Sequence, residues 1–540
     1  MQGTMMNYPL TLTSILERAG HLFPKQEIIT RLPDKSLHRY TYADFYRRAR
    51  ALAEALQKAG LKKGDRVATL SWNTYAHLEA YFGIPAAGGV LHTLNLRLHP
   101  NDVAYIVQHA EDRFLIVDDV LLPLLEKCRA DIKPERVLVV PLTGQPIPPG
   151  MGLESYEDFL ASATGDFDYP ALSEDDPSGM CYTSGTTGKP KGVVYTHRST
   201  VLHSLGSALP DVLNLSMKDV LLPVVPMFHV MAWGLPFTGV MMGSKMVMPG
   251  PHLDAASLLD LYESEKVTKT AGVPTIWMGV LQALQKEPTR WKLQPMEMVV
   301  GGSAAPETLI RAYDQFGLKV LHAWGMTETS PLGTTSRLKT NLQGGSADEQ
   351  YAYRATQGIP TPLVEVRAVG ESGPVPWDGV SMGELEVRGP WVASGYYRLE
   401  AENDKWSPDG WFRTGDVATI NPEGYVKITD RTKDLIKSGG EWISSLDLEN
   451  ALMGHPAVKE AAVIAIPHPK WAERPLAAVV LKDGAQATAE ELKKYLEPKF
   501  AKWWLPDAVV FISEIPRTST GKFLKAQLRD QYKSWQWESA

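Results

Sequence analysis

The chain has 540 residues, of which 44% are hydrophobic and 22% charged, the composition of an ordinary globular protein. That length exceeds what one hydrophobic core normally supports, so two or more domains are expected. The net charge of −7 balances 62 acidic against 55 basic residues mixed along the chain, which argues against a nucleic-acid surface. The two cysteines, Cys128 and Cys181, lack metal-ligand spacing, so we expect no structural disulfide and a location in the reducing cytoplasm.

Neither terminus carries a recognisable targeting signal. Residues 1–14 lack a basic segment followed by an apolar core, and the final ESA is not a peroxisomal signal. Residues 220–244 contain no Asp, Glu, Lys or Arg, a length that could span a bilayer. Three prolines and three glycines interrupt this stretch, so we expect a buried core segment and no transmembrane helix.

Predicted strands and helices alternate through the first part of the chain. A capping box at residues 41–44 predicts the start of an amphipathic helix. Three apolar runs, at residues 67–70, 114–117 and 137–140, are predicted to be buried strands, and another helix is expected after Pro100. This alternation predicts right-handed βαβ units and parallel sheets that helices cover on both faces.

The predicted secondary-structure elements change in the second half of the chain. Residues 322–331, HAWGMTETSP, are predicted to form a polar loop after a strand. From Thr361 onward, short strands and turns predict a small β-rich subdomain. We expect an α/β N-terminal domain over residues 1–429, a hinge at 430–435, and a small, mobile α+β domain at 436–540.

An anion-binding loop is predicted at residues 182–195, which read YTSGTTGKPKGVVY. Glycines let backbone N–H groups surround an anion, while hydroxyls add donors and lysines add positive charge for a polyphosphate. A flexible linker is the plainer interpretation, but apolar residues flank the stretch on both sides. The nucleotide P-loop pattern does not fit, because Gly185 and Gly188 are too close and Pro190 replaces the Mg²⁺-binding hydroxyl. The candidate ligands are Thr183, Ser184, Gly185, Thr186, Thr187, Gly188 and Lys191.

Three charged residues in later motifs could complete this site. Glu328 lies between Thr327 and Thr329, and such a group suits Mg²⁺ that substrate phosphates also hold. Asp416, at a predicted strand-edge turn, could accept both hydroxyls of a ribose. Lys522 lies in the glycine loop PRTSTGKFLK. Each residue alone is typical of a solvated surface, so the prediction depends on their combination.

Together these stretches resemble the signatures of the adenylate-forming superfamily, which comprises acyl-CoA synthetases, luciferases and nonribosomal adenylation domains. The resemblance covers nearly the whole chain. Through residues 322–333 and 436–456 it is closest to fatty acyl-CoA synthetases and 3-methylmercaptopropionate-CoA ligases. It implies ATP, Mg²⁺ and CoA as partners and allows a homodimer. The adenine-stacking tyrosine of the family is replaced by Trp324, whose indole can still stack on a base.

The resemblance also assigns roles to single side chains. Lys522 matches the catalytic lysine, which bridges the carboxylate and the α-phosphate during in-line attack. Glu328 and Thr183 match metal-binding positions, and Thr327 matches a contact to the α-phosphate. Asp416 and Arg431 match positions that bind the ribose. The other matched ATP-binding positions are Gly302, Ser303, Ala304, His322, Ala323, Trp324, Gly325, Met326 and Lys433.

Two further pockets follow from the resemblance. The acyl group would contact His229, Trp233, Gly301, Gly302 and Pro331, although a buried structural role for His229 or Trp233 stays open. No aspartate lies near His229 to receive an α-ammonium group, so a neutral apolar carboxylate is preferred over an amino acid. Lys433 would be the hinge residue, and the CoA tunnel would be formed by Lys437, Ser438, Gly439, Gly440, Glu441 and Trp442.

The leading functional hypothesis is an AMP-forming carboxylate–CoA ligase that works by domain alternation. ATP and a short- or medium-chain fatty or thioether acid, such as 3-methylmercaptopropionate, would give an acyl-adenylate and pyrophosphate. The CoA thiol would then release acyl-CoA and AMP. Alternatives are a long-chain fatty acyl-CoA synthetase, adenylation for transfer to a carrier protein, and a lipid-binding pseudoenzyme. Luciferase-like oxidation also stays open, because a fold does not fix a function.

Overall fold

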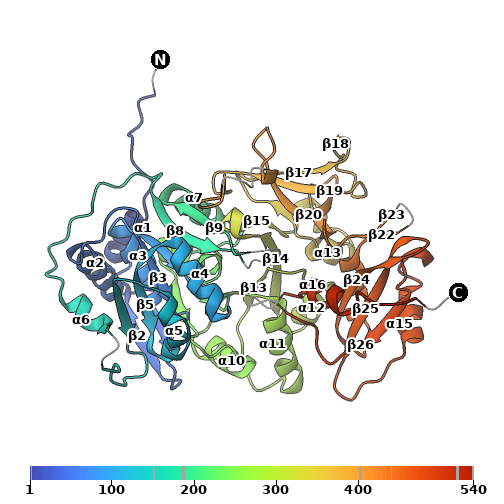
Figure 1. Cartoon of the computed structure of the whole chain (residues 1–540), viewed down its shortest axis with the longest axis horizontal. Coiled ribbons are helices and arrows are strands. Elements are labelled where there is room, and N and C mark those ends of the chain that lie inside the picture. The colour runs from blue at the N-terminus through green and yellow to red at the C-terminus, as the bar shows by residue number, and fades with distance from the viewer. Residues whose placement is uncertain are drawn as a thin grey trace.

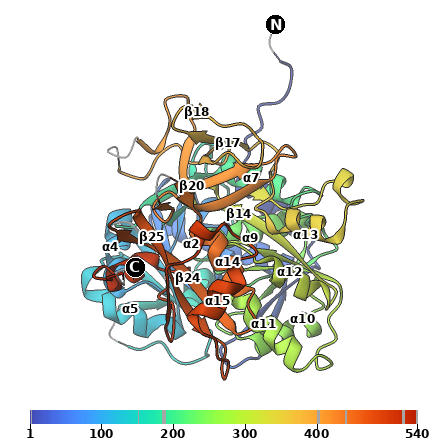
Figure 2. The ribbon, with the colours of Figure 1, turned by 90° about the vertical axis from the view of Figure 1, so that its right-hand side faces the viewer.

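The computed structural model describes residue 1 and residues 3–149, 152–183, 189–399, 404–438, 441–517 and 522–537, with only the backbone at residues 441 and 442. Within these residues the chain forms four β-sheets in three parts (Figure 1). Two large sheets and their helices form the N-terminal part, an antiparallel sheet lies beside them, and the last sheet belongs to the C-terminal part. Figure 2 shows this C-terminal part in front of the large sheets. The predicted fold class is confirmed.

The first large sheet has seven strands, and all its neighbours are parallel except the last pair, β8 and β9. The predicted runs at 67–70, 114–117 and 137–140 are three of its strands. In spatial order the strands are β7 (Leu153–Ser155), β6 (Arg136–Val140), β5 (Asp112–Asp118), β3 (Arg66–Leu70), β4 (Val90–Thr93), β8 (Pro177–Tyr182) and β9 (Gly192–Thr196).

The second large sheet has nine strands with a parallel centre and antiparallel pairs at both edges. In spatial order the strands are β16 (Ile359–Pro360), β15 (Leu332–Thr335), β14 (Leu318–Gly325), β13 (Met296–Val300), β12 (Lys269–Gly272), β10 (Val220–Pro223), β11 (Lys245–Met248), β1 (Glu27–Arg31) and β2 (Leu37–Thr41).

Helices cover these sheets in layers, because strands buried on both faces need apolar partners on both sides. The main core contains side chains from both sheets and from α1 (Leu12–Leu22), α2 (Tyr42–Lys58), α3 (Tyr75–Ala86), α6 (Tyr156–Ala161), α7 (His197–Ala208) and α9 (Leu235–Met242). The outer helices are α4 (Pro100–Ala110) and α5 (Leu122–Cys128) on the first sheet and α10 (Ala255–Ser264), α11 (Pro274–Lys286), α12 (Glu307–Asp314) and α13 (Ala347–Ala355) on the second.

The remaining two sheets are smaller and largely antiparallel. The β-rich sheet has the spatial order β18 (Gly373–Pro374), β17 (Glu365–Gly370), β19 (Gly383–Arg388), β20 (Phe412–Ile420) and β21 (Val426–Arg431). The C-terminal sheet contains β23 (Glu441–Ile443), β22 (Ile436–Ser438), β25 (Ala472–Leu481) and β24 (Val458–His468), with β26 (Ala508–Phe511) parallel to β25. Its helices are α14 (Ser445–Met453), α15 (Ala489–Leu496) and α16 (Lys525–Gln531).

Helix α2 shows how local sequence sets an element's position. The Thr41 hydroxyl accepts a hydrogen bond from the Asp44 backbone N–H, and the Asp44 carboxylate accepts one from the Thr41 N–H, so the predicted capping box is confirmed. Its apolar stripe is fully buried between the sheets at Phe45, Ala49 and Leu52.

The uncharged stretch at residues 220–244 is buried, as predicted. It forms strand β10, the one-turn helix α8 (Val230–Trp233) and helix α9, and side chains such as Met227, Met231 and Phe237 belong to the main core. In the described part of the chain, no helix has the length and apolar character needed to cross a membrane.

One predicted loop is wrong in part. Residues His322–Gly325 continue strand β14, and only Thr327–Thr329 turn away from the sheet, as a 3₁₀ turn. The reason is tertiary pairing: Ala323 and Trp324 lie opposite Thr335 and Thr334 of β15, which returns antiparallel. The polar sequence of these residues thus predicts a loop, although they form the end of a buried strand.

Candidate active site

Two adjoining cavities contain most of the residues that the sequence analysis singled out. The first, of about 330 Å³, is lined by Thr183, Lys191, His229, Trp233, Glu328 and Pro331, among others. The second, of about 270 Å³, is lined by Ser303, Ala304, His322, Asp416 and residues of α14 and α16. The residues that line both cavities are Gly302, Ala323, Trp324, Gly325, Met326, Arg431, Lys433 and Lys522. Lys522 therefore lies where the two cavities meet.

The predicted phosphate loop joins the antiparallel strands β8 and β9. Its two ends are tied together, because Thr183 N–H donates to Lys191 O at 2.9 Å and Lys191 N–H donates to the Thr183 hydroxyl at 3.2 Å. Ser184–Gly188 lie outside the described residues. From β9, the Tyr195 hydroxyl donates to the carbonyl oxygen of Thr327 at 2.9 Å. The hairpin that carries the loop thus contacts the turn that carries Glu328.

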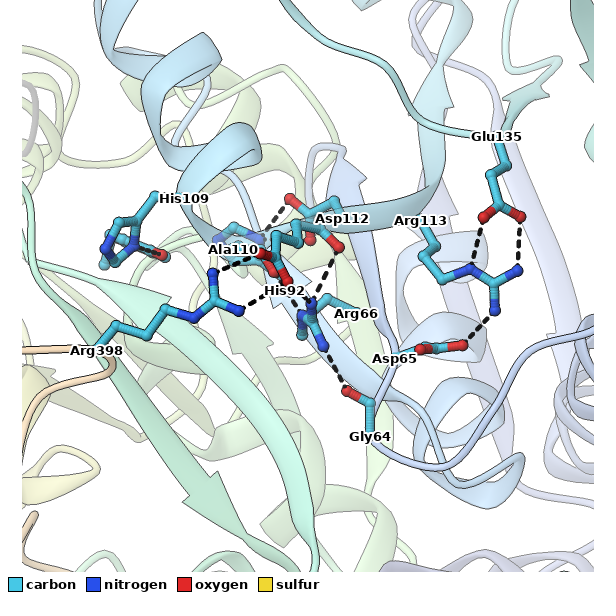
Figure 3. A network of polar contacts seen from close by, with 12 residues as sticks. Gly64, Asp65, Arg66, His92, His109, Ala110, Asp112, Arg113, Glu135 and Arg398 are labelled. Atoms are coloured by element: carbon cyan, nitrogen blue, oxygen red, sulfur yellow. Dashed lines mark hydrogen bonds and ion pairs between the residues drawn. The ribbon is translucent and has the colours of Figure 1, made fainter.

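A polar network lies on the side of this hairpin that contacts residues 397–398 (Figure 3). Arg398, from the segment after β19, makes two hydrogen bonds of 2.6 and 2.8 Å to the Glu111 carboxylate at the α4–β5 turn. Arg66 also reaches Glu111, while the buried His92 pairs with Asp112 at 2.8 Å. Next to Arg398, Tyr397 N–H donates to Gly192 O at 2.8 Å. These contacts join the segment after β19 to the seven-stranded sheet.

Glu328 is a buried carboxylate whose orientation is set by its neighbours. The Tyr396 hydroxyl donates to Glu328 Oε1 at 2.6 Å, and Ala393 N–H donates to the Glu328 carbonyl at 2.7 Å. Burial raises the pKa of Glu328, and the hydrogen bond from Tyr396 opposes this shift. A bound cation would favour the ionised form of such a group.

The donor set fits Mg²⁺ that is shared with a substrate. No cluster of three or more His, Cys, Asp or Glu side chains that could hold a metal occurs within the described ranges. Glu328 and the Thr183 hydroxyl line the same cavity and could supply one or two oxygen ligands. Mg²⁺ commonly takes few protein ligands and completes its shell with phosphate oxygens and water, so these residues suit such an ion.

Asp416 does not lie at a strand-edge turn as predicted. It lies within β20, opposite Arg431 of β21 and beside an irregularity in strand register. Its Oδ2 accepts a 2.9 Å hydrogen bond from Trp324 Nε1, and its Oδ1 lies 3.5 Å from Arg431 Nε. Trp324 is also packed on Gly333, where a Cβ atom would lie 2.5 Å from the ring. One carboxylate therefore holds both the candidate stacking ring and a cation.

Lys522 enters the cavities just ahead of helix α16. Burial lowers the pKa of Lys522 to about 8, and the Arg431 guanidinium adds to this effect while Asp416 and Glu328 oppose it. An ammonium group in this position is poised to gain an anionic partner. Because the group titrates near neutral pH, its charge also depends on what binds beside it.

The helix behind Lys522 is anchored to the predicted hinge. Lys525 Nζ lies 2.6 Å from both Glu449 Oε1 and Ser445 Oγ, and Ser445 in turn donates to the Asp430 carboxylate at 2.5 Å. One turn later, Arg529 pairs with Asp434 at 2.5 Å. Helix α16 and residues 430–434 are thus held together, which fixes the entry direction of Lys522.

The acyl end of the first cavity contains Trp233 against two glycines. A Cβ atom at Gly301 would lie 3.1 Å from Trp233 Cη2, and one at Gly302 would lie 4.0 Å from Trp233 and 3.9 Å from Lys522 Cε. Burial lowers the pKa of His229 to about 3, so this ring is neutral. The lining is otherwise apolar, with Leu213, Leu235, Val299 and Leu332.

The backbone that carries Trp233 is unusual. Residues 230–233 all have positive φ, between 45° and 59°, although none of them is glycine. Non-glycine residues rarely adopt this left-handed conformation, and such positions cluster at functional sites. Nothing in the apolar sequence of the segment predicted it.

Two of the predicted CoA residues, Lys437 and Ser438, have described side chains, and both lie apart from the two cavities. Lys437 and Ser438 form β22, where Ser438 is buried and accepts a 3.0 Å hydrogen bond from Arg474. Gly439 and Gly440 lie outside the described residues, and Glu441 and Trp442 are described only as backbone of β23. Neither Lys437 nor Ser438 lines a cavity that contains Lys522. The structure thus brings the described ATP and acyl candidates together but leaves Lys437 and Ser438 outside.

Two site residues were missed by the sequence analysis. Tyr396 contacts Glu328, and Lys405 lines the first cavity. The glycine–tyrosine pair at 395–396 was a signal that could have been weighed, since a glycine lets an aromatic side chain turn back toward the core. No local signal distinguishes Lys405 from a solvated surface lysine.

Comparison with known proteins agrees with this geometry. Residues 16–397 match the AMP-binding enzyme family, and residues 447–522 match the AMP-binding enzyme C-terminal domain. The chain is 52% identical to a long-chain-fatty-acid–CoA ligase of Thermus thermophilus, covering 99% of this chain and 97% of that one. It is 44% identical to a 3-methylmercaptopropionyl-CoA ligase of Ruegeria lacuscaerulensis, covering 99% of both.

A solved structure agrees as well. The crystal structure of ATP-bound MatB from Rhodopseudomonas palustris superposes with a TM-score of 0.82 at 28% identity, over 97% of this chain and 99% of that one. The family matches and the two relatives each cover most of the sequence. The chain belongs to the AMP-binding enzyme family, the adenylate-forming enzymes, and within it to the AMP-forming acyl-CoA ligases.

Proposed function

We propose that this enzyme joins CoA to neutral, apolar carboxylic acids of short or medium length, either fatty acids or thioether acids such as 3-methylmercaptopropionate. The position of Lys522 carries the proposal. Its ammonium group lies between a cavity with an apolar end and a second cavity lined by Asp416 and Trp324. A carboxylate bound in the first cavity and a nucleotide bound in the second would meet at this lysine.

In the first half-reaction the carboxylate oxygen attacks the α-phosphorus of ATP and pyrophosphate leaves. Lys522 neutralises charge on the carboxylate and the α-phosphate as the new bond forms. Asp416 and Arg431 would hold the ribose, and Trp324 would stack on the adenine. Glu328 and Thr183 would bind Mg²⁺, which supplies charge neutralisation on the phosphates.

In the second half-reaction the CoA thiol attacks the carbonyl carbon of the acyl-adenylate and AMP leaves. Because Lys437 and Ser438 lie outside both cavities, the predicted CoA residues must move relative to the adenylate for this step. We place this movement at a hinge of residues 430–435, between an N-terminal domain of residues 1–429 and a C-terminal domain of residues 436–540. Lys522 would leave the site as Gly439–Gly440 enter it.

The acid class follows from the lining of the first cavity. Among its described lining residues Glu328 is the one carboxylate, and it lies beside Tyr396 rather than at the apolar end. An α-ammonium group would therefore meet no counter-charge there, while an alkyl or thioether chain would contact leucine, valine and tryptophan side chains. We also propose that the enzyme acts in the cytoplasm as a homodimer.

A panel of acids tests this assignment. The purified enzyme would be assayed with ATP, Mg²⁺ and CoA for AMP and for the acyl thioester, using straight-chain acids from acetate to palmitate, 3-methylmercaptopropionate and leucine. We expect thioester formation to be fastest with short and medium acids and absent with leucine. AMP release without a thioester would favour transfer to a carrier protein, and absence of both products would refute ligase activity on these acids.

Long-chain acids are the second candidate, because the Thermus thermophilus relative at 52% identity is a long-chain-fatty-acid–CoA ligase. Trp233 distinguishes between short- or medium-chain and long-chain acids as substrates, because its position determines how far the acyl tunnel extends. Each buried CH₂ group contributes about 0.8 kcal/mol, so an open tunnel would raise kcat/KM roughly fourfold per carbon until it ends. Trp233 in contact with Gly301 closes the tunnel early, so we expect a flat or falling preference beyond medium chains.

Replacing Trp233 with alanine should shift the optimum toward longer acids. The measurement is kcat/KM for straight-chain acids of increasing length in both proteins. Replacement of Trp377, a half-exposed tryptophan that lines neither cavity, provides a matched control. An unchanged length profile in Trp233→Ala would show that the indole is only part of the core.

A further inference from the structure

Lys405 is a cation in the first cavity that neither the motifs nor the family matches include. It lies in the short turn before β20, between the two matched regions of residues 16–397 and 447–522. Its side chain is half-buried and lines the cavity together with Thr183, Lys191 and Glu328. A lysine that was merely solvated would not line this cavity.

The neighbouring residues hold Lys405 in place. Trp406 Nε1 donates to Ala393 O at 2.7 Å, and the Trp406 ring lies 5.4 Å from the ring of Tyr396 and 5.3 Å from that of Phe412. Ala393 and Tyr396 are the same residues that contact Glu328. Lys405 and Glu328 are thus positioned by one set of contacts.

Lys405 is a cation of the cavity that also contains the Glu328 carboxylate. Across the described residues it forms no ion pair with a carboxylate. A half-buried, unpaired ammonium group is unfavourable unless an anion binds beside it.

The lining of the two cavities indicates which anion this is. Lys189, Lys191 and Lys405 line only the first cavity, whereas Asp416 and Ser303 line only the second, where the nucleoside would bind. Lys522 lies between them. An ATP molecule that crosses this junction would place its α-phosphate at Lys522 and its β- and γ-phosphates toward Lys405 and Glu328.

We propose that Lys405 is a further catalytic residue, which binds the β- and γ-phosphates of ATP and stabilises departing pyrophosphate; this rests on the proposed ligase function. When the carboxylate oxygen forms its bond to the α-phosphorus, the bond from that phosphorus to the α–β bridging oxygen breaks. The bridging oxygen keeps the electron pair and becomes a terminal oxygen of pyrophosphate. Lys405 offsets the charge that develops there.

The test compares Lys405→Met, which keeps the side-chain length without the charge, with Lys405→Arg, which keeps the charge. In Lys405→Met we expect acyl-adenylate formation to slow by about ten- to a hundredfold and inhibition by inorganic pyrophosphate to weaken to a similar degree. Inhibition by AMP and thioester formation from a pre-made acyl-adenylate should stay within about twofold, because neither involves pyrophosphate. Lys405→Arg should recover most of the loss.

Lys218→Met, at an exposed lysine of the same part of the chain, is the matched control and should behave as the unmodified enzyme. Unchanged inhibition by pyrophosphate in Lys405→Met, or equal weakening of pyrophosphate and AMP, would overturn the proposal. Calorimetric titration of pyrophosphate with Mg²⁺ into both proteins tests the site without turnover. If the unmodified enzyme activates no acid, the ligase function fails, and this titration still decides whether Lys405 binds pyrophosphate.

Discussion

Replacing Lys522 with alanine should slow acyl-adenylate formation by about 10²–10³-fold, the usual loss when one group that stabilises transition-state charge is removed. Lys522, like Arg431 and Lys433, is a cation that lines both cavities, so its loss removes counter-charge from the carboxylate and the α-phosphate. Thioester formation from a pre-made acyl-adenylate should largely survive, because that step requires Lys522 to be elsewhere. The measurement is a separate rate for each half-reaction.

Two further results would accompany this one. Lys470→Ala, at an exposed lysine of the C-terminal part, should leave both half-reactions unchanged. Since the pKa of Lys522 is lowered to about 8, the ammonium group is present below that pH and lost above it. In the unmodified enzyme, kcat/KM for adenylation should therefore fall as the pH rises through about 8. An equal loss of both half-reactions in Lys522→Ala would contradict the alternation of domains.

Replacing Glu328 with glutamine should lower adenylation by roughly a hundredfold or more and raise the Mg²⁺ concentration needed for half-maximal rate. Glutamine keeps the shape of the side chain and can still accept the hydrogen bond from Tyr396, so the change removes mainly the negative charge. The measurement is AMP formation as a function of Mg²⁺ concentration at fixed ATP.

Tyr396→Phe should give a smaller effect in the same direction, about tenfold, because it frees the Glu328 carboxylate to rotate without removing it. Glu371→Gln, at an exposed glutamate of the β-rich sheet, serves as the control. If Glu328→Gln lowered the rate equally at all Mg²⁺ concentrations, the residue would act on the fold of its turn and not on a metal.

Local sequence predicted those parts of the fold that depend on neighbouring residues. The capping box at Thr41 and Asp44 fixes the start of α2, and apolar runs such as residues 114–117 identify the buried strands. Strand order could not be predicted, because pairs such as β4 with β8 join residues far apart in the chain. The polar sequence of His322–Gly325 predicts a loop, but pairing with β15 makes these residues part of a strand.

The candidate site shows the same division. Motifs at Glu328, Asp416 and Lys522 were recognisable because each carries a charged residue in a glycine- or threonine-rich stretch of sequence. The hydrogen bond between Trp324 and Asp416 joins residues 92 positions apart, so no local pattern could indicate it. Lys405 stands in an ordinary polar stretch, and only the folded cavity gives it a neighbour such as Glu328.

The left-handed turn at residues 230–233 is a strained backbone segment that carries the indole of Trp233. Non-glycine residues in this conformation cost about 1–2 kcal/mol each, and packing of Met231, Ala232 and Trp233 in the main core holds the turn in place. Relaxation of this turn would release strain and move the Trp233 ring away from Gly301. We therefore expect the conformation of residues 230–233 and the space beside Gly301 to change together.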